Sequence, residues 1–551
     1  MGQALLVRPA ILLCTLNAKY IHASLALRYL LANMGELRAQ TALCEYTIAR
    51  RPADLAAELL ALLGPAEAGR VQVIGFGVYI WNVSQTCELV RLLKAARPAL
   101  KVVLGGPEVS HEHAQQAIVA LADHVITGWG DVSFPKLCRA LLHGPLPLMK
   151  VIAGEQPPLD EIALPYTEYS DADLAHRVLY VEASRGCPFK CEFCLSSLDK
   201  TAWAFDLDPF LAQLDQLYQR GARQFKFVDR TFNLKAEASA RILQFFLDRL
   251  PAAPRAPDLA PDLFVHFELI PDQLPERLKT LIAQFPAGVL QFEIGIQSFN
   301  PEVQQRISRR QDHAKTLANL DWLVTHSQAH LHTDLIFGLP GETLASFAQG
   351  FDTLHALHPH EIQLGLLKRL RGTPIARHTE LWGMVYDAEP PYAVQQTSVL
   401  SRDQVQRFVR LARYWDLVAN SGRFKLTLAL LLQGASPFAA FLSWSDWLWQ
   451  RSGQTSGLTP EQLVDHLFDY LTESRQGTEA ASAGRLAPEA LQATVLGVLL
   501  ADYLASGARA RPRALRPVLP AQGPPAARSG AGLVPRQQQH ALGANPPMIS
   551  P

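Results

Sequence analysis

The fold is decided by the segment Ser184-Arg-Gly-Cys-Pro-Phe-Lys-Cys-Glu-Phe-Cys194, which holds three of the chain's seven cysteines. An apolar run at 178–183 precedes it and predicts a buried strand. An ordinary electron-transfer [4Fe–4S] cluster is held by four cysteine thiolates. Here only Cys187, Cys191 and Cys194 are close together, and no cysteine follows them. The spacing C-x3-C-x2-C therefore predicts a [4Fe–4S] cluster with one iron left open for a ligand other than protein.

Zinc is the main alternative for these thiols. A structural zinc site would need a fourth Cys or His at finger-like spacing, and the next histidine downstream is His266. A buried group of free thiols is a further alternative. A secreted disulfide framework is not expected, because it would spread an even number of cysteines through a much shorter chain.

Downstream of the cysteines, apolar strands alternate with amphipathic helices. Six such units predict an incomplete parallel barrel over residues 178–370, with its functional residues at the carboxyl ends of the strands. A segment rich in Pro and Ala at 251–261 is expected to be a surface insertion. The expected strands are 178–183, 224–228, 264–269, 289–296, 331–337 and 361–367.

Upstream of the cysteines, residues 1–144 also alternate between strands and helices. Five apolar runs separated by helical patterns predict a five-stranded parallel sheet with helices on both faces. Ligands of such sheets bind beyond the carboxyl ends of the strands. The expected strands are 10–16, 41–46, 71–80, 101–104 and 124–127.

The rest of the chain divides by composition. Residues 145–177 are expected to be a linker, because Pro and Gly are frequent from 144 to 165. Residues 371–506 are expected to form a helical domain, and residues 507–551, rich in Arg, Pro and Ala, to form a disordered tail. The predicted class is therefore α/β with an α-helical C-terminal domain.

Charge and hydropathy exclude some functions. The chain has 551 residues, with 51 Lys and Arg against 51 Asp and Glu, so its formal net charge is zero. This balance lacks the basic excess expected of a nucleic-acid-binding protein. No apolar run is long enough to span a membrane, and the N-terminus does not have the pattern of a signal peptide. We therefore expect a cytoplasmic protein with no nucleic-acid or membrane partner.

The cysteine motif after the first barrel strand resembles the radical S-adenosylmethionine (radical SAM) superfamily. In that family the open iron is chelated by S-adenosylmethionine (SAM), whose reductive cleavage starts radical chemistry. The resemblance implies a [4Fe–4S] cluster on Cys187, Cys191 and Cys194, and places Phe193 near the adenine. It also implies an electron donor such as a reductase, flavodoxin or ferredoxin.

A second region supports the resemblance independently of the cysteines. Gly295-Ile-Gln-Ser-Phe-Asn-Pro and Thr333-Asp-Leu-Ile-Phe-Gly-Leu-Pro-Gly-Glu resemble oxygen-independent coproporphyrinogen oxidase and its relatives. By that resemblance Gln297, Arg309, Asp334 and Glu268 contact SAM. A guanidinium fork suits a carboxylate, so Arg309 would pair with the methionyl carboxylate. Asp334 would accept the ribose hydroxyls, and Glu268 would bind the SAM amino group.

The chain departs from the family where a glycine-rich loop usually follows the second barrel strand. Here the sequence is Val228-Asp-Arg-Thr-Phe232, which resembles the radical SAM members that depend on cobalamin. The resemblance implies that Asp229 lies near the cofactor. Glu293 is a further carboxylate without an assigned role.

The N-terminal five-stranded sheet resembles the cobalamin-binding Rossmann-like domain of the same enzymes. Gly105 and Gly106 follow the fourth strand, and Gly128 and Gly130 follow the fifth, where the family's loops face the cobalamin. Glycine allows the backbone to approach a large ligand closely. The D-x-H-x-x-G motif that supplies an axial histidine is missing, so we expect His22 to be a loop or capping residue.

These resemblances imply a cobalamin-dependent radical SAM enzyme acting on a small molecule. Methylation of an unactivated carbon is favoured, and a redox or ring-forming reaction like that of magnesium-protoporphyrin ester cyclase remains open. tRNA modification and a non-enzymatic cobalamin or redox sensor are less favoured. No local motif identifies the substrate.

Overall fold

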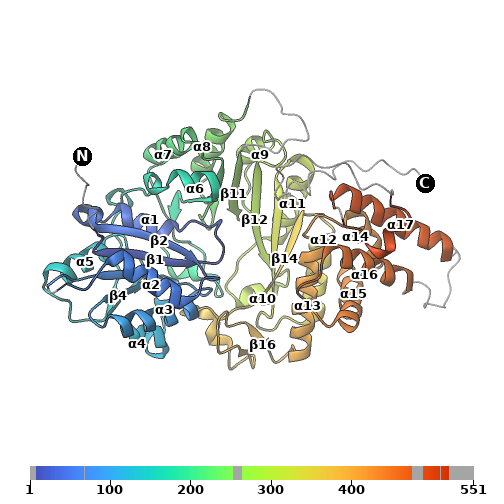
Figure 1. Ribbon diagram of the computed structural model, residues 1–551. Helices are drawn as coiled ribbons and strands as arrows, with labels where there is room; N and C mark the ends of the chain where they lie inside the picture. The colour runs from blue at the N-terminus through green and yellow to red at the C-terminus, as the bar shows by residue number, and fades with distance from the viewer. Residues whose placement is uncertain (1–7, 68, 252–262, 474–487, 509, 520–551) are drawn as a thin grey trace.

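The computed structural model describes residues 8–67, 69–251, 263–473, 488–508 and 510–519 (Figure 1). Of the expected insertion at 251–261, all but the first residue falls outside these ranges. Within them, no helix is both long and apolar enough to cross a membrane.

The N-terminal domain is built on six parallel strands in the order β2-β1-β3-β4-β5-β6. Five of them match the five expected strands, and the sixth, β6, lies in the segment expected to be a linker. β6 pairs with β5 at the edge of the sheet and has only three residues, too few to show a strand pattern. The strands are β1 (Ile11–Asn17), β2 (Thr41–Thr47), β3 (Val73–Gly77), β4 (Lys101–Gly105), β5 (His124–Thr127) and β6 (Val151–Ala153).

Helices cover both faces of this sheet (Figure 1). All seven residues of β1 are buried, as expected for a central strand covered on both sides. One core cluster joins α2, α3 and α4 to the sheet, and the other joins α1 and α5. The helices are α1 (Leu25–Ala32), α2 (Pro52–Leu63), α3 (Val83–Ala96), α4 (Ala117–Leu121) and α5 (Ser133–His143).

The second domain is also a six-stranded parallel sheet, in the order β14-β13-β12-β11-β10-β7. Neighbouring strands in this order follow one another in sequence, which confirms the predicted incomplete barrel with β7 and β14 at its edges. The strands are β7 (Leu179–Val181), β10 (Gln224–Phe227), β11 (Phe264–Leu269), β12 (Leu290–Gln297), β13 (His330–Phe337) and β14 (Glu361–Leu366). The helices of this domain are α7 (Leu207–Gln219), α8 (Ala236–Leu247), α9 (Glu276–Ile282), α10 (Pro301–Arg306), α11 (His313–His326) and α12 (Leu344–His355).

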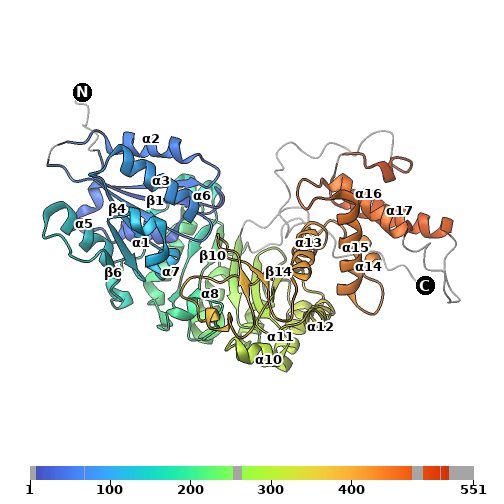
Figure 2. The same cartoon turned by 90° about the horizontal axis from the view of Figure 1, so that it is seen from below.

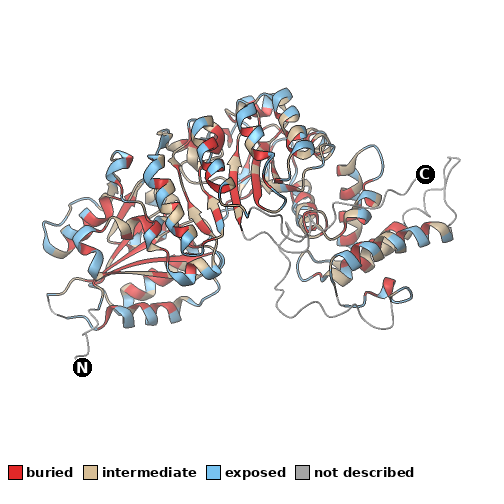
Figure 3. Cartoon of the chain, turned by 90° about the horizontal axis from the view of Figure 1, so that it is seen from above, coloured by how far each residue is buried: buried red, intermediate tan, exposed pale blue. Residues whose placement is uncertain are grey.

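The two faces of the barrel sheet differ in chemistry. One face packs into the main core through buried aromatic side chains of successive strands, among them Phe227, Phe267 and Phe292. Side chains alternate between faces along a strand, so Lys226, Glu268 and Glu293 lie on the opposite face. Figure 3 shows the strands of both sheets as mostly buried, with exposed residues on the outer surfaces of the helices. The polar face is therefore the concave side on which a ligand can bind.

The N-terminal domain contacts both edges of the barrel sheet. At the β7 edge, the buried guanidinium of Arg28 pairs with Glu45 at 2.8 Å and with Asp173, from α6 (Asp171–His176), at 2.9 Å. Beyond the β14 edge, Arg371 Nε donates to Glu108 Oε1 at 2.8 Å. Buried ion pairs of this kind fix the geometry of a contact, because an unpaired buried charge is costly.

The C-terminal region is largely helical, with a short β-hairpin before the helices. β15 (Val385–Tyr386) and β16 (Val394–Gln396) form this hairpin, which the expected helical domain from residue 371 did not include. Phe408 stacks on Phe337 of the barrel at 4.1 Å between ring centroids. The helices are α13 (Arg402–Val418), α14 (Lys425–Leu431), α15 (Pro437–Ser452), α16 (Pro460–Glu473) and α17 (Pro488–Ala505), which lie on the side of the barrel away from the N-terminal domain (Figure 2).

Part of the expected disordered tail packs against the C-terminal helices. Residues 510–519 are ordered, the Leu515 side chain is fully buried, and the Ala514 amide donates to Asp465 Oδ1 of α16 at 2.8 Å. Burial of this leucine offsets the entropic cost of ordering a short Pro-rich segment. Residues 520–551 lie outside the described residues.

Candidate functional site

A cavity of about 200 Å³ lies at the carboxyl ends of the barrel strands, on the concave face. It is lined by the loop after β7 and by the ends of β11, β12 and β13. Among its lining residues are the three cysteines and five of the six predicted SAM contacts: Phe193, Glu268, Gln297, Arg309 and Asp334. The structure therefore brings these residues together around one cavity.

The three cysteines of the motif are free thiols in the loop between β8 (Ser184–Arg185) and β9 (Trp203–Ala204). Cys187 and Cys191 are buried, and burial raises the pKa of the Cys187 thiol to about 11. Arg309 Nη1 lies 3.5 Å from Cys191 Sγ. Among the described residues, no three His, Cys, Asp or Glu side chains are grouped closely enough to hold one metal ion. In a [4Fe–4S] cluster each thiolate binds a different iron, so the sulfurs need not converge on one point.

Two polar atoms beside the cysteines are buried and unpaired. They are Gln297 Oε1 and Arg309 Nε, and both residues line the cavity. A buried polar group without a partner is costly, so a ligand that supplied the missing hydrogen bonds would be favoured. SAM offers both an amine and a carboxylate, and these atoms fit it.

The backbone around Gln297 explains how its side chain reaches the cavity. β12 bulges between Gly295 and Gln297, and Gln297 has φ +71°, a left-handed conformation rare for residues other than glycine. A Cβ on Gly295 would lie 2.4 Å from Gln297 Nε2, so a larger residue there would displace the end of the Gln297 side chain. Arg309 also donates to the Gly295 carbonyl. The bulge therefore re-aims the Gln297 side chain, as bulges beside functional sites often do, and the Gly295 carbonyl at the same bulge binds Arg309.

Two carboxylates complete this side of the cavity. Glu268 Oε1 accepts a hydrogen bond from Arg230 Nη1 at 2.9 Å, and burial raises the pKa of Glu268. Asp334 Oδ1 lies 3.3 Å from His332 Nε2, and burial likewise raises the pKa of Asp334. Both carboxylates have a cationic neighbour and a side facing the cavity, so each can accept a donor from a ligand.

Asp229 lies apart from the other predicted SAM contacts. Its carboxylate is buried and accepts hydrogen bonds from the Ala183 amide at 2.9 Å and from Ser184 Oγ at 2.5 Å. Burial raises its pKa to about 7. It lines a separate small cavity behind the cysteine loop. These contacts join the end of β10 to the end of β7, a structural role for Asp229 that does not require a bound cofactor.

Resemblance assigned no role to three polar residues at the site, Arg230, Lys226 and Glu293. Arg230, next to Asp229, lines the cavity and pairs with Glu268. Glu293 accepts from His266 Nε2 at 3.1 Å and lies 3.6 Å from Lys226 Nζ. Burial raises the pKa of Glu293, but the His266 hydrogen bond and the Lys226 charge outweigh it and lower the pKa to about 2. Period-two alternation along β10 and β12 could have placed Lys226 and Glu293 on the concave face.

The glycines predicted to face cobalamin lie in the loops that meet the barrel. A Cβ on Gly106, which has φ +105°, would lie 2.5 Å from the Val78 carbonyl, so the fold itself requires this glycine. Gly128 has φ +70° with no atom within 4 Å of a Cβ, and Gly105 has only the Ile126 carbonyl at 3.8 Å. A Cβ on Gly130 would meet Leu30 at 3.0 Å. At Gly105 and Gly128 an added Cβ would therefore meet no close neighbour.

The loop at 128–131 is joined directly to the cysteine loop. Trp129 Nε1 donates to Asp199 Oδ2 at 2.7 Å, and the Asp199 carbonyl accepts from the Cys187 amide at 2.9 Å. Arg185 Nη1 also donates to Asp131 Oδ2 at 2.8 Å. By contrast, His22 Nδ1 bonds the Tyr180 hydroxyl at 2.7 Å beside β7, as expected of a loop histidine.

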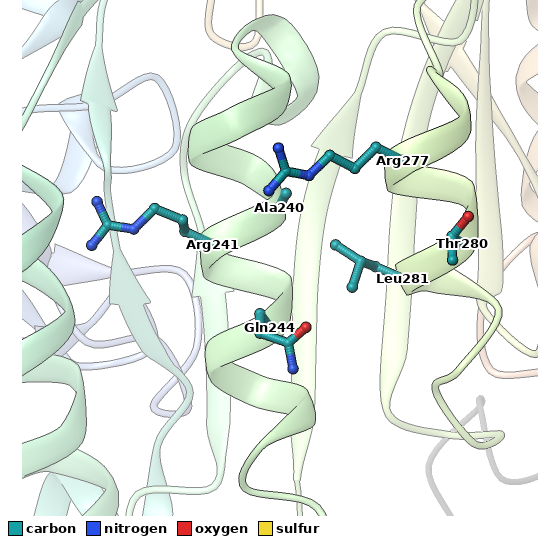
Figure 4. A pocket seen from close by; sticks show the side chains of 6 residues that line it. All are labelled: Ala240, Arg241, Gln244, Arg277, Thr280 and Leu281. Carbon is teal, nitrogen blue, oxygen red and sulfur yellow. The ribbon is translucent and has the colours of Figure 1, made fainter.

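A larger cavity of about 430 Å³ lies between α8 and α9 and is not a candidate active site (Figure 4). Its two arginines already pair with carboxylates: Arg241 with Asp208 and Arg277 with Glu237. It lies between helices and contains no thiol, histidine or carboxylate in its lining.

Comparisons with known proteins find three family matches along the chain. Residues 181–354 match the radical SAM superfamily and residues 11–138 match the B12 binding domain, so the chain carries both domains. Residues 380–519 match a family described as protein of unknown function (DUF4080). The radical SAM domain implies a [4Fe–4S] cluster and SAM, and the B12-binding domain implies cobalamin.

Curated relatives include methyltransferases. The chain is 25% identical over 380 residues to 2-(S-pantetheinyl)-carbapenam-3-carboxylate methyltransferase of Streptantibioticus cattleyicolor, covering 60% of this chain and 54% of that protein. It is 24% identical to the cobalamin-dependent radical SAM methyltransferase TokK of Streptomyces tokunonensis, with the same two coverages. The chain thus spans about half the length of these relatives. Over 97 residues, 18% of this chain and 21% of the relative, it is 31% identical to oxygen-independent coproporphyrinogen III oxidase of Paracoccus denitrificans.

Solved structures share the fold at low identity. The cobalamin-dependent radical enzyme OxsB, with aqua-cobalamin and SAM bound, aligns with a TM-score of 0.58 at 14% identity, covering 90% of this chain and 80% of that one. The methyltransferase TsrM of Kitasatospora setae, with cobalamin and a [4Fe–4S] cluster bound, aligns with a TM-score of 0.53 at 16% identity, covering 71% and 82%. These likenesses confirm the predicted fold class.

Proposed function

We propose that this chain is a cobalamin-dependent radical SAM enzyme that methylates an unactivated carbon of a small molecule. The observation that carries the proposal is the direct connection between the two domains. The loop at 128–131 of the B12-binding domain is bonded through Trp129 and Asp199 to the loop that holds the cysteines. Such a connection suits an enzyme that uses two cofactors on one substrate.

In this proposal Cys187, Cys191 and Cys194 hold the cluster, and Gly105, Gly106, Gly128 and Gly130 lie beside cobalamin. When bound, the cluster and SAM supply one-electron cleavage of the sulfonium, which starts the radical reaction. Domain boundaries at 177 and 370 remain part of the proposal, whereas β6 extends the first domain beyond 144 and residues 510–519 extend the C-terminal domain beyond 506.

The chain's own residues would orient SAM. The Arg309 fork pairs with its carboxylate, because a guanidinium offers two parallel donors to a planar anion. Gln297 and Glu268 accept from its amine, Asp334 accepts from its ribose hydroxyls, and Phe193 packs against the adenine. Asp229 supports this arrangement by holding the Ala183 amide and Ser184 hydroxyl at the start of the cysteine loop.

The concave face favours a polar substrate. The interior of an ordinary parallel barrel is filled by branched apolar side chains. Here the Lys226 and Glu293 side chains face the interior and are 32% and 33% exposed. Together they offer a cation and an anion beside the cavity, which suits a small molecule carrying charged or hydrogen-bonding groups and not a hydrocarbon.

A non-methylating redox or ring-forming reaction is the second candidate. It is supported by the likeness to coproporphyrinogen oxidase, which covers 18% of this chain. An electron donor such as a reductase, flavodoxin or ferredoxin is part of either proposal.

Transfer of labelled methyl groups tests the proposal. The anaerobically reconstituted protein would be incubated with a chemical reductant, SAM carrying a trideuterated methyl group, and a small-molecule extract of its own source cells, followed by mass spectrometry. A metabolite that gains the trideuterated methyl group supports methylation. Formation of 5′-deoxyadenosine with an altered but unlabelled metabolite would favour the redox alternative. Cys191→Ala is the control and should abolish both, and no 5′-deoxyadenosine from the loaded wild type would contradict the proposal.

A further inference from the structure

Glu192, inside the cysteine motif, is buried and does not line the cavity. Its side chain is only 3% exposed and has three partners. Ser308 Oγ donates to Glu192 Oε1 at 2.6 Å, and His378 Nε2 lies 2.8 Å from Oε2. The third partner is the guanidinium of Arg377. A buried carboxylate needs such partners, so these contacts hold it firmly.

The backbone of Glu192 makes the same connections as its side chain. Its amide donates to the Ile307 carbonyl at 3.0 Å, and its carbonyl accepts from the Ile375 amide at 3.0 Å. Ile307 and Ser308 follow α10, whereas Ile375 belongs to the 3-10 helix Pro374–His378. One residue therefore ties the cysteine loop to two segments distant in sequence.

One of these segments carries the candidate SAM ligand Arg309. Ser308, the residue before it, has φ +54°, in the left-handed region that a residue with a Cβ avoids. Such a conformation persists where surrounding contacts enforce it. The hydrogen bond from Ser308 Oγ to Glu192 and the bond from the Arg309 amide to the Gln304 carbonyl at 2.9 Å are contacts of this kind.

We propose that Glu192 is a positioning residue that holds Arg309 beside the cysteines that would bind the cluster. In an enzyme with the proposed function, on which this inference rests, Glu192 fixes the turn at Ser308. The Arg309 guanidinium then stays beside Cys191 and meets the SAM carboxylate. Glu192 touches neither cofactor and acts through Arg309.

The test is SAM binding to the reconstituted, reduced protein, measured both as a dissociation constant and as the change that SAM causes in the cluster's electron paramagnetic resonance spectrum. Glu192→Gln keeps the size of the side chain and removes its charge. We expect full iron content, a SAM dissociation constant about tenfold higher, and a smaller spectral change, since a lost charged hydrogen bond is worth roughly one power of ten in affinity. Glu302→Gln is the matched control, because it breaks the exposed pair between Glu302 and Arg306 of α10.

A double-mutant cycle shows whether Glu192 acts through Arg309. In an Arg309→Gln background, Glu192→Gln should add little further loss of SAM affinity, because the group it positions is already gone. A variant Glu192→Gln that carries a full cluster and binds SAM as tightly as the wild type overturns the proposal. If Glu192→Gln cannot load iron, Ser308→Ala decides: weaker SAM binding on a full cluster supports the proposal, and unchanged binding overturns it. A loaded wild-type protein that does not bind SAM would instead contradict the proposed function.

Discussion

Replacing Arg28 by methionine tests how the two domains are joined. The Arg28 side chain is 1% exposed, and its guanidinium pairs with Glu45 at 2.8 Å and with Asp173 at 2.9 Å. Its Nη1 also donates to the Ser24 carbonyl at 2.9 Å. Arg177 pairs with Glu45 at 2.8 Å, so two arginines balance two carboxylates. Arg28→Met keeps most of the volume but leaves one buried carboxylate charge unbalanced.

The expected cost is large for a single substitution. Removing one partner of a buried ion pair costs roughly 3–5 kcal/mol, because the remaining charge stays desolvated. The free energy of unfolding would be measured with urea, following tryptophan fluorescence and circular dichroism separately, since a chain of several domains need not unfold in one step. Arg38→Met is the control: Arg38 pairs with Glu168 at 2.7 Å across the same two regions but is 47% exposed. It should cost less than about 1 kcal/mol. A cost for Arg28→Met no greater than that for Arg38→Met would refute the reasoning.

Three further predictions follow from single side chains. Gln297→Ala should leave the iron content unchanged and weaken SAM binding about tenfold, because the unpaired Oε1 of Gln297 lies at the cavity. An unchanged SAM affinity, measured by calorimetry, would contradict this assignment. Burial lowers the pKa of His332, but the Asp334 hydrogen bond and the Glu361 and Glu293 charges outweigh it and raise it to about 9. The stabilisation from protonated His332 is therefore fully present below pH 6.5 and is lost as the pH rises through about 9. Between pH 6.5 and 9.5 the free energy of unfolding, measured by urea titration, should fall by roughly 1–3 kcal/mol more in the wild type than in His332→Gln. Equal falls in the two proteins would contradict this prediction. Leu515→Ala should lower the unfolding free energy of the C-terminal helices by about 2–4 kcal/mol, as for a fully buried leucine; no change in thermal or urea unfolding would mean that residues 510–519 do not pack there in solution.

The sequence predicted both sheets, because their strands are apolar runs of several residues separated by helices. β6 was not predicted, because Val151–Ala153 is a three-residue edge strand within a Pro-rich segment. The order in residues 510–519 was also missed, since it depends on Leu515 meeting helices far away in sequence. Long periodic patterns thus predict elements, whereas short segments depend on tertiary contacts.

The site was predicted in part. Resemblance assigned Gln297 and Arg309, and the structure brings both to the cysteine cavity, Gln297 at the bulge in β12 and Arg309 after α10. Resemblance also assigned Asp229, whose carboxylate bonds the end of β7, while the adjacent Arg230 lines the cavity. Which of two neighbouring polar residues faces a cavity depends on the exact end of the strand. Sequence patterns leave strand ends uncertain by a few residues.

The most direct measurement is the metal content of the anaerobically reconstituted protein. After incubation with iron, sulfide and hydroxocobalamin and then desalting, about four irons and one cobalt per chain are expected, and Cys194→Ala should lose the iron. Four irons without cobalt would keep the cluster but contradict a cobalamin-dependent reaction. Stoichiometric zinc with neither iron nor cobalt would contradict the central claim.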